Sequence, residues 1–252
     1  MKITSEVLSL IKKGISINQI RSRTGFAKST IYYHYKKIKG RKIKRIKFNF
    51  QNEGELGEFL GIFAGDGSFF RGKNGKYVIR IYTGYYEEGY RKYLEEAFDT
   101  WFSKPPKVYL IKSEGMHSAV AFTYGSKQIY ELLKEHLYWG KNKTHTVKLK
   151  EFDLQRKEFN LGFLRGLIDT DGNYYFPKRR LSFSSTSEAL ANQAREIINE
   201  QGITTNFRSF TYPKETHRAE LYTLTLHGDK AHKVIKLIKP SNPNKRYKAP
   251  FV

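Results

Sequence analysis

Two stretches of the chain carry small residues at the same four-residue spacing within otherwise hydrophobic sequence. The small residues of the first stretch are Gly57, Gly61 and Gly65, and those of the second are Gly162, Gly166 and Thr170. On a helix this spacing places the small residues in one stripe, which allows two backbones to approach closely. The pattern therefore predicts two helices that pack face to face. Each ends in Asp-Gly, and we expect the glycines, Gly67 and Gly172, to be left-handed C-caps.

The hydrophobic pattern after each of these helices repeats in the same order. In the first half it predicts strands over residues 68–73, 77–83, 107–112 and 119–124, with helices over 87–102 and 126–137. In the second half it predicts strands over residues 173–176, 181–184, 205–212 and 221–226, with helices over 187–201 and 229–238. The unit is thus αββαββα, present twice. Antiparallel hairpins with helices on one side give an α+β fold with one open sheet face.

The first 38 residues predict a separate, small all-α unit. Ser16 and Gln19 form a capping-box pattern that opens a second helix, and a third helix begins near Lys28. Two helices joined by a short turn are the plan of a helix-turn-helix domain, although a three-helix protein-contact module would have the same pattern. The domains predicted are therefore 1–38 (helix-turn-helix), 39–51 (basic linker), 52–142 (first repeat) and 143–252 (second repeat).

Charge indicates the kind of partner. The 252 residues include 46 Lys and Arg against 24 Asp and Glu, a formal net charge of +22. This excess predicts a polyanionic partner, nucleic acid before membrane. The absence of cysteine excludes disulfides and cysteine-ligated zinc, and neither a transmembrane run nor a signal peptide is evident. We expect the protein where DNA is: in the cytoplasm with the nucleoid, or in an organelle of a eukaryotic host.

Asp66 and Asp171 have no stabilising reason to lie at the ends of helices. A carboxylate in the last turn opposes the helix dipole. If the two glycine stripes pack together, both carboxylates arrive side by side and repel each other unless a divalent cation binds there. The alternative is that Asp-Gly merely forms a turn after a core helix. The predicted metal-binding set is Asp66 and Asp171 with the residues before them, Gly65 and Thr170.

Residues 164–172, with the sequence LRGLIDTDG, resemble the motif of the LAGLIDADG homing endonucleases. Residues 59–67 (FLGIFAGDG) are a looser copy, in which Ala64 stands opposite Asp169. Two motifs in one chain resemble the monomeric branch of that family, over about residues 52–252. Residues 14–33 resemble the resolvase/invertase helix-turn-helix, which implies that Lys28, Ser29, Thr30 and Tyr33 face the major groove.

The resemblance implies a fold, an activity and a catalytic set. The fold is two αββαββα repeats forming a pseudo-two-fold DNA-binding saddle. The activity is a double-strand cut in a long, asymmetric DNA target by a monomer, with Mg²⁺ (Mn²⁺ as substitute) held by Asp66 and Asp171. The enzyme would be encoded in an intron or free-standing. A basic residue after the last helix of each half is also implied, and the repeat phase selects Lys143 and Lys245.

Basic and aromatic side chains recur along the predicted strands and the linker, where they can hold phosphates or read bases. The predicted DNA-binding residues outside the first unit are Arg41, Lys42, Arg71, Lys73, Lys76, Arg80, Tyr82, Lys178, Arg180, Ser182, Arg208 and Arg218. Each taken alone is compatible with a solvated surface charge. Two alternative functions remain on the same fold: a transcription regulator that binds DNA without cutting it, and an RNA maturase.

Overall fold

The computed structural model describes residues 4–40, 46–72, 75–213, 216 and 219–246, and the chain divides into two compact units, residues 1–45 and 46–252. The smaller unit consists of three helices, α1 (Ser5–Lys12), α2 (Ile17–Thr24) and α3 (Lys28–Lys39). Their hydrophobic faces meet in a small core whose fully buried members are Val7, Ile11, Ile20 and Ile31.

Local hydrogen bonds fix where α2 begins and ends. The Ser16 hydroxyl accepts from Gln19 N, and the Gln19 side chain accepts from Ser16 N, so the predicted capping box is confirmed. Gly25, at φ 70°, ends α2 in the left-handed conformation that glycine adopts without strain. The chain then turns directly into α3.

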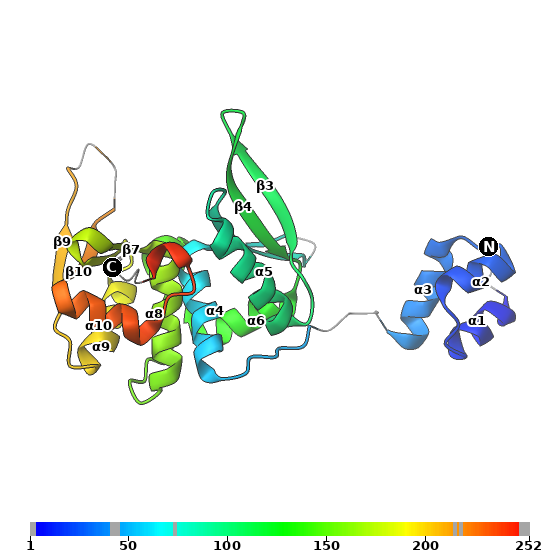
Figure 1. Cartoon of the computed structure of the whole chain (residues 1–252). Coiled ribbons are helices and arrows are strands. Elements are labelled where there is room, and N and C mark those ends of the chain that lie inside the picture. Colours follow the sequence, from blue (N-terminus) through cyan, green and yellow to red (C-terminus); the bar gives the residue numbers. More distant parts are fainter. Residues whose placement is uncertain (1–3, 41–45, 73–74, 214–215, 217–218, 247–252) are drawn as a thin grey trace, which may run out of the picture. The chain divides into compact units, whose positions relative to one another are not determined.

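The larger unit contains two αββαββα halves (Figure 1). The elements of the first half are α4 (Glu53–Asp66), β1 (Gly67–Arg71), β2 (Tyr77–Gly84), α5 (Glu88–Phe102), β3 (Lys107–Ser113), β4 (Met116–Tyr124) and α6 (Lys127–His136). Those of the second half are α8 (Lys157–Asp171), β7 (Gly172–Tyr175), β8 (Arg180–Ser185), α9 (Glu188–Glu200), β9 (Asn206–Phe210), β10 (Leu221–His227) and α10 (Gly228–Ile238). The fold is the mixed, antiparallel α+β architecture that the pattern predicts.

Each half has its own four-stranded sheet, with the orders β1-β2-β4-β3 and β7-β8-β10-β9, and all strand pairs are antiparallel. The β3–β4 hairpin extends well beyond the helices of its half (Figure 1). The connection between the halves adds three short elements that hydrophobic periodicity does not predict: β5 (Leu137–Tyr138), α7 (Lys143–Thr146) and β6 (Lys148–Leu149). Two short 3-10 helices, η1 (Phe176–Lys178) and η3 (Pro243–Lys245), complete the second half.

The glycine stripes bring α4 and α8 into backbone contact. A Cβ on Gly57 or Gly61 would overlap the carbonyl oxygen of Phe159 or Phe163, and a Cβ on Gly166 would overlap that of Glu58. Only glycine therefore permits this approach, and the predicted helix pair is confirmed. Large hydrophobic side chains leave the pair on opposite sides.

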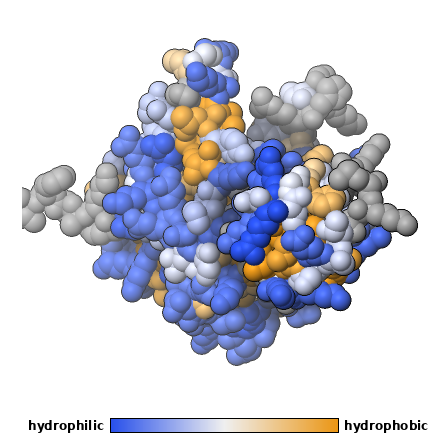
Figure 2. Space-filling model, turned by 90° about the vertical axis from the view of Figure 1, so that its right-hand side faces the viewer, coloured by the Kyte–Doolittle hydropathy of each residue, from blue (hydrophilic) through white to orange (hydrophobic). Residues whose placement is uncertain are grey.

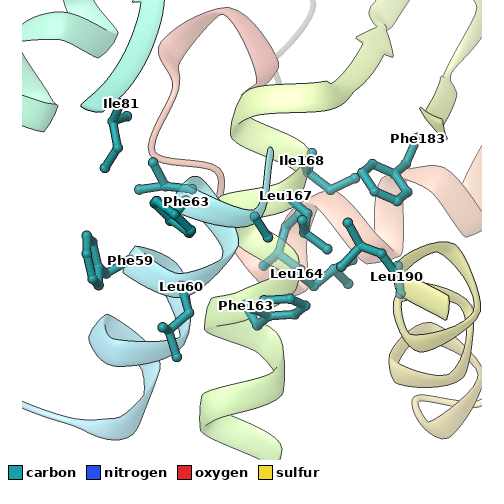
Figure 3. Packing of buried hydrophobic residues seen from close by; sticks show 14 of the residues in the cluster. Phe59, Leu60, Phe63, Ile81, Phe163, Leu164, Leu167, Ile168, Phe183 and Leu190 are labelled. Carbon is teal, nitrogen blue, oxygen red and sulfur yellow. The ribbon is translucent and has the colours of Figure 1, made fainter. Parts of the chain in front are cut away.

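Figure 3 shows these side chains of α4 and α8 in the core of the larger unit. Phe63 of α4 lies on the side of Ile81 in the first sheet, and Ile168 of α8 lies on the side of Phe183 in the second. All four are buried members of one continuous hydrophobic core. The helix pair is thus the common centre from which both sheets are positioned.

The prediction that Gly67 and Gly172 are left-handed caps is wrong. Gly67 has φ −84° and ψ 145°, and Gly172 has φ −77° and ψ 157°, so both are extended. Glycine is needed there for space, because a Cβ would collide with the carbonyl oxygen of Phe63 or lie 2.6 Å from that of Ile168. Each helix therefore passes directly into the first strand of its sheet, and the preceding aspartate lies at that junction. Within the described part of the chain, no helix is long and apolar enough to cross a membrane.

Candidate active site

Asp66 and Asp171 are the last residues of α4 and α8, so the helix packing brings both carboxylates to one end of the pair. A Cβ on Gly65 would lie 2.9 Å from Oδ2 of Asp171 and would overlap the Thr170 hydroxyl. The Asp171 carboxylate therefore lies against the last turn of the opposite helix, directly beside the residue that precedes Asp66. The missing side chain of Gly65 makes the room for it.

The two carboxylates raise the electrostatic energy of the site. Burial, followed by the negative charge of Asp171, raises the pKa of Asp66 to about 7. Part of the Asp171 residue reaches solvent, but its carboxyl is largely desolvated by the surrounding protein atoms, which raises its pKa, while the positive charges of Lys143 and Lys245 lower it. A pair of carboxylates in this position favours the binding of a cation.

Lys143 closes the end of α4. Its Nζ donates to the carbonyl oxygens of Phe63 (2.8 Å), Ala64 (2.7 Å) and Gly65 (3.2 Å). These carbonyls belong to the last turn, where a positive charge also complements the helix dipole. Burial lowers the pKa of Lys143 to about 8, although Asp171 and Asp66 partly offset this effect.

Lys245, in η3, has the equivalent position in the second half. Its Nζ donates to the carbonyl oxygens of Asp169 (2.7 Å) and Thr170 (2.9 Å) at the end of α8. Burial lowers the pKa of Lys245, and Asp169 and the other nearby carboxylates oppose that shift. The structure thus brings together the two aspartates at the helix ends and the two lysines that the repeat phase selects, with one ammonium group at each helix end.

The oxygen atoms at this place fit a hard divalent cation. The Asp171 carboxylate lies beside Gly65 and interacts electrostatically with that of Asp66. Each aspartate directly follows a residue, Gly65 or Thr170, that contributes a backbone carbonyl group. Each of those two carbonyls already accepts one hydrogen bond from a lysine, which leaves a second lone pair. Mg²⁺ binds through one or two carboxylates and keeps several waters, so it needs no larger protein cage. Among the described residues there is no cluster of three or more His, Cys, Asp and Glu that could hold a metal.

Asp169 and its partners hold the segment that carries Lys245. Its carboxylate accepts hydrogen bonds from Ser241 N (2.9 Å) and Asn242 N (3.0 Å), and Asn242 Nδ2 donates to Glu87 Oε1 (3.0 Å) in the first half. Asp169 is buried, and burial raises its pKa to about 7 against the effect of these two backbone donors. Ala64, the matching position of the first half, makes no such bond, so this support exists for only one of the two lysines.

Glu58 extends this buried network across the helix pair. Its carboxylate lies 2.8 Å from Arg165 Nη1 and accepts hydrogen bonds from the Tyr93 and Ser241 hydroxyls, both at 2.6 Å. These partners come from α8, α5 and the segment after α10, so the network ties both halves together. The sequence gives only one sign of this network, which is the presence of the acidic Glu58 inside an otherwise hydrophobic helix.

Most of the predicted DNA-contacting residues lie on the open sheet faces or on the small unit. Arg71 does not: it pairs with Tyr77, which packs against Tyr130 of α6, so Arg71 lies on the helix-covered face of the first sheet. Lys178 lies in η1 rather than on a strand. Of those described in the larger unit, Arg71, Lys76, Arg80, Lys178, Arg180 and Arg208 are exposed, and Tyr82 and Ser182 are partly buried. On α3, Lys28, Ser29 and Tyr33 are exposed and Thr30 is partly buried. Arg41, Lys42, Lys73 and Arg218 lie outside the described residues.

Comparison with known proteins agrees with this architecture. Residues 158–239 match the model of the LAGLIDADG-like domain. Mesophilic variants of the homing endonuclease I-DmoI superpose with a TM-score of 0.53 at 15% identity, covering 74% of this chain and 95% of theirs. The larger unit has the LAGLIDADG fold.

Two further solved structures with the LAGLIDADG fold are similar to this chain. I-DmoI in complex with DNA and Ca gives a TM-score of 0.54 at 15% identity and covers 74% of this chain and 89% of that one. I-DmoI in complex with DNA and Mn gives a TM-score of 0.53 at 14% identity, and the match covers 74% of this chain and 96% of that one. No curated protein sequence matches the chain. At these identities the likeness concerns the fold.

Proposed function

We propose that this protein is a site-specific, divalent-metal-dependent double-strand DNA endonuclease that acts as a monomer. The observation that carries the proposal is the pairing of Asp66 with Asp171 at the ends of two helices whose backbones touch. A structural role does not explain it, because each carboxylate opposes its own helix dipole and repels the other. The complexes of I-DmoI with DNA and with Ca or Mn support the same assignment by fold.

The four site residues form two pairs, and each pair has its own role in this proposal. Asp66 and Asp171, with the carbonyls of Gly65 and Thr170, hold Mg²⁺, for which Mn²⁺ substitutes. The bound cation would stabilise the negative charge that develops at the phosphate during hydrolysis. Lys143 and Lys245 place positive charge at the same edge, where they attract the two backbones of the duplex.

The rest of the molecule binds and selects the duplex. The open faces of the two sheets carry different side chains, so one monomer would bind two unlike half-sites and the target is asymmetric. The three-helix unit would act as a helix-turn-helix that places Lys28, Ser29, Thr30 and Tyr33 against adjacent DNA. Arg41 and Lys42 of the linker would follow the phosphate backbone.

The roles of the aspartates are tested with charge-removing variants. Asp66→Asn and Asp171→Asn are each expected to abolish cleavage of a bound duplex in Mg²⁺ while binding of the same duplex remains. Asp153→Asn, which changes a carboxylate outside the site, is the matched control and is expected to cut normally. Cleavage that persists in the double variant would overturn the assignment. A chain that binds DNA tightly and cuts in neither Mg²⁺ nor Mn²⁺ would be a regulator or an RNA-binding maturase.

A further inference from the structure

The open face of the first sheet carries an aromatic and apolar row. Cross-strand pairing places Tyr82 of β2 beside Ala121 of β4, and Ala121 beside Tyr109 of the edge strand β3. The next row on the same face contains Arg80, Thr123 and Lys107, in the same strand order. The face therefore has two side-by-side rows, one of rings around an alanine and one with a cation at each end.

The equivalent rows of the second sheet have a different chemistry. Ser184 of β8 pairs with Thr223 of β10, and Thr223 pairs with Arg208 of β9. The Ser184 and Thr223 hydroxyls lie 2.9 Å apart and share a hydrogen bond. The next row holds only uncharged hydrogen-bonding groups, which are those of Asn173, Ser182, Thr225 and Asn206. Where the first sheet has rings and a methyl group, the second has hydroxyls and a guanidinium.

The two rings in the apolar row of the first sheet reach solvent and are surrounded by positive charge, whereas Ala121 between them is buried. Tyr109 is 49% exposed, and Ile111, two residues further along the same face of β3, is 38% exposed. Both lie in a hollow that Lys76, Arg80, Lys104 and Lys107 also line, and none of the described residues lining it is acidic. The surface seen in Figure 2 is mostly hydrophilic, with hydrophobic residues gathered in a few patches.

A partner for this face must be polyanionic and must also present small apolar groups. A DNA duplex does both, because its phosphates meet the lysines and arginine while the C5-methyl groups of thymines project into the major groove. A two-stranded ribbon such as β3–β4 fits that groove. The hydroxyl and amide rows of the second sheet suit hydrogen bonds to base edges instead.

We propose that the first sheet selects thymines in its half-site through their methyl groups, by the rings of Tyr82 and Tyr109 on either side of the buried Ala121, whereas the second sheet reads its half-site by hydrogen bonds. This inference rests on the DNA binding of the proposed function but not on cleavage. The two halves of the target therefore differ in the kind of contact that recognises them, and not only in sequence.

The test begins with selection of bound duplexes from a randomised pool by the full-length chain, without divalent metal. The double variant Tyr82→Ser, Tyr109→Ser is selected in parallel, and the half-site whose consensus changes is the one on the first sheet. Thymines of the wild-type consensus are then replaced by deoxyuridine, which lacks only the methyl group, in one half-site at a time. Ser184→Ala, at the matching position of the second sheet, is the specificity control: it can alter only the second-sheet half-site and is expected to keep the deoxyuridine effect in the first-sheet half-site.

We expect deoxyuridine in the first-sheet half-site to weaken wild-type binding about fourfold for each contacted thymine, the effect of losing one buried methyl-sized group. The same replacement in the other half-site is expected to leave binding unchanged, and the double variant is expected to lose the deoxyuridine effect. Thermal unfolding of the variants checks that they are folded.

Other results would overturn the proposal. Equal deoxyuridine effects in both half-sites, or none in either, would refute methyl recognition while DNA binding and cleavage stand. A double variant that changes self-association and not the consensus would show that this face binds a second copy. Failure to enrich any duplex would overturn the proposed function as well.

Discussion

Replacing Gly61 by alanine tests the contact on which the whole site depends. Gly61 lies in the middle of α4, and a Cβ there would overlap the carbonyl oxygen of Phe163 and lie 3.0 Å from Leu167 N and 3.1 Å from the Gly166 Cα. All three neighbours are backbone atoms of α8, so no side-chain rotation relieves the overlap. The two helices must move apart, which also separates Asp66 from Asp171.

The cost follows from two opposing effects. Overpacking of a well-packed core costs about 1–3 kcal/mol, and the rigid backbone on the other side places this site at the upper end. Alanine regains about 1 kcal/mol through its higher helix propensity. We therefore expect Gly61→Ala to lower the free energy of unfolding by about 2 kcal/mol. For a unit of this size that corresponds to a fall in melting temperature of about 4–8 °C.

The matched control is Gly54→Ala in the same helix. Its Cβ would meet the flexible Glu158 side chain at Cγ (3.3 Å) and Asn52 Oδ1 (3.2 Å), which caps the helix and needs to shift only slightly, so we expect a change within about 1 kcal/mol. Calorimetry measures stability, and titration with Mn²⁺ measures metal affinity, which only Gly61→Ala should weaken. If both variants melt and bind Mn²⁺ alike, the close helix contact does not position the aspartates.

Three further substitutions test the charges around the site. Burial and Asp171 raise the pKa of Asp66 to about 7, so its ionisation destabilises the metal-free fold as pH rises from about 4 to 7. Asp66→Asn should therefore raise the free energy of unfolding in EDTA at pH 8 by about 1–2 kcal/mol, allowing for partial solvent exposure, and equal denaturation midpoints would contradict this. Lys143→Met removes the donor to three carbonyl groups, so it should lower the free energy of unfolding by about 1–2 kcal/mol and slow cleavage. Unchanged denaturation curves and unchanged single-turnover cleavage rates would refute this prediction. Glu58→Ala leaves the Arg165 charge without its partner and should lower the free energy of unfolding by about 3 kcal/mol. The control, Glu131→Gln in an exposed ion pair, should lower it by less than about 0.5 kcal/mol. Similar losses for both variants in urea unfolding would show that the buried network contributes little to stability.

The helix pair and its two aspartates could be predicted from the repeated pattern, and the two lysines from the family resemblance combined with the repeat phase. Small residues every fourth position indicate a contact stripe, and two copies of one unit allow Lys143 and Lys245 to be found by their matching phase. The extended conformation of Gly67 could not be predicted in this way. A glycine is needed at position 67 because a side chain there would collide with Phe63, and not because the backbone adopts a left-handed conformation.

The buried network was also beyond local reasoning. Glu58 bonds to Ser241, which is 183 residues away, and the packing of tertiary elements alone brings them together. Asp169 could be identified as part of the motif, but its role as acceptor for the segment that carries Lys245 depends on backbone groups. The short strands β5 and β6 contain two residues each, too few to show any alternation.

The central claim, metal-dependent cutting of a specific duplex, is tested most directly on the DNA that flanks the protein's own gene. Two linear substrates are compared, one with the flanking sequences joined and one with the gene in place, each in Mg²⁺ and in EDTA. We expect a double-strand cut of the joined flanks in Mg²⁺ only, and no cut when the gene interrupts them. Tight binding to the joined flanks without cleavage in either Mg²⁺ or Mn²⁺ would contradict the claim.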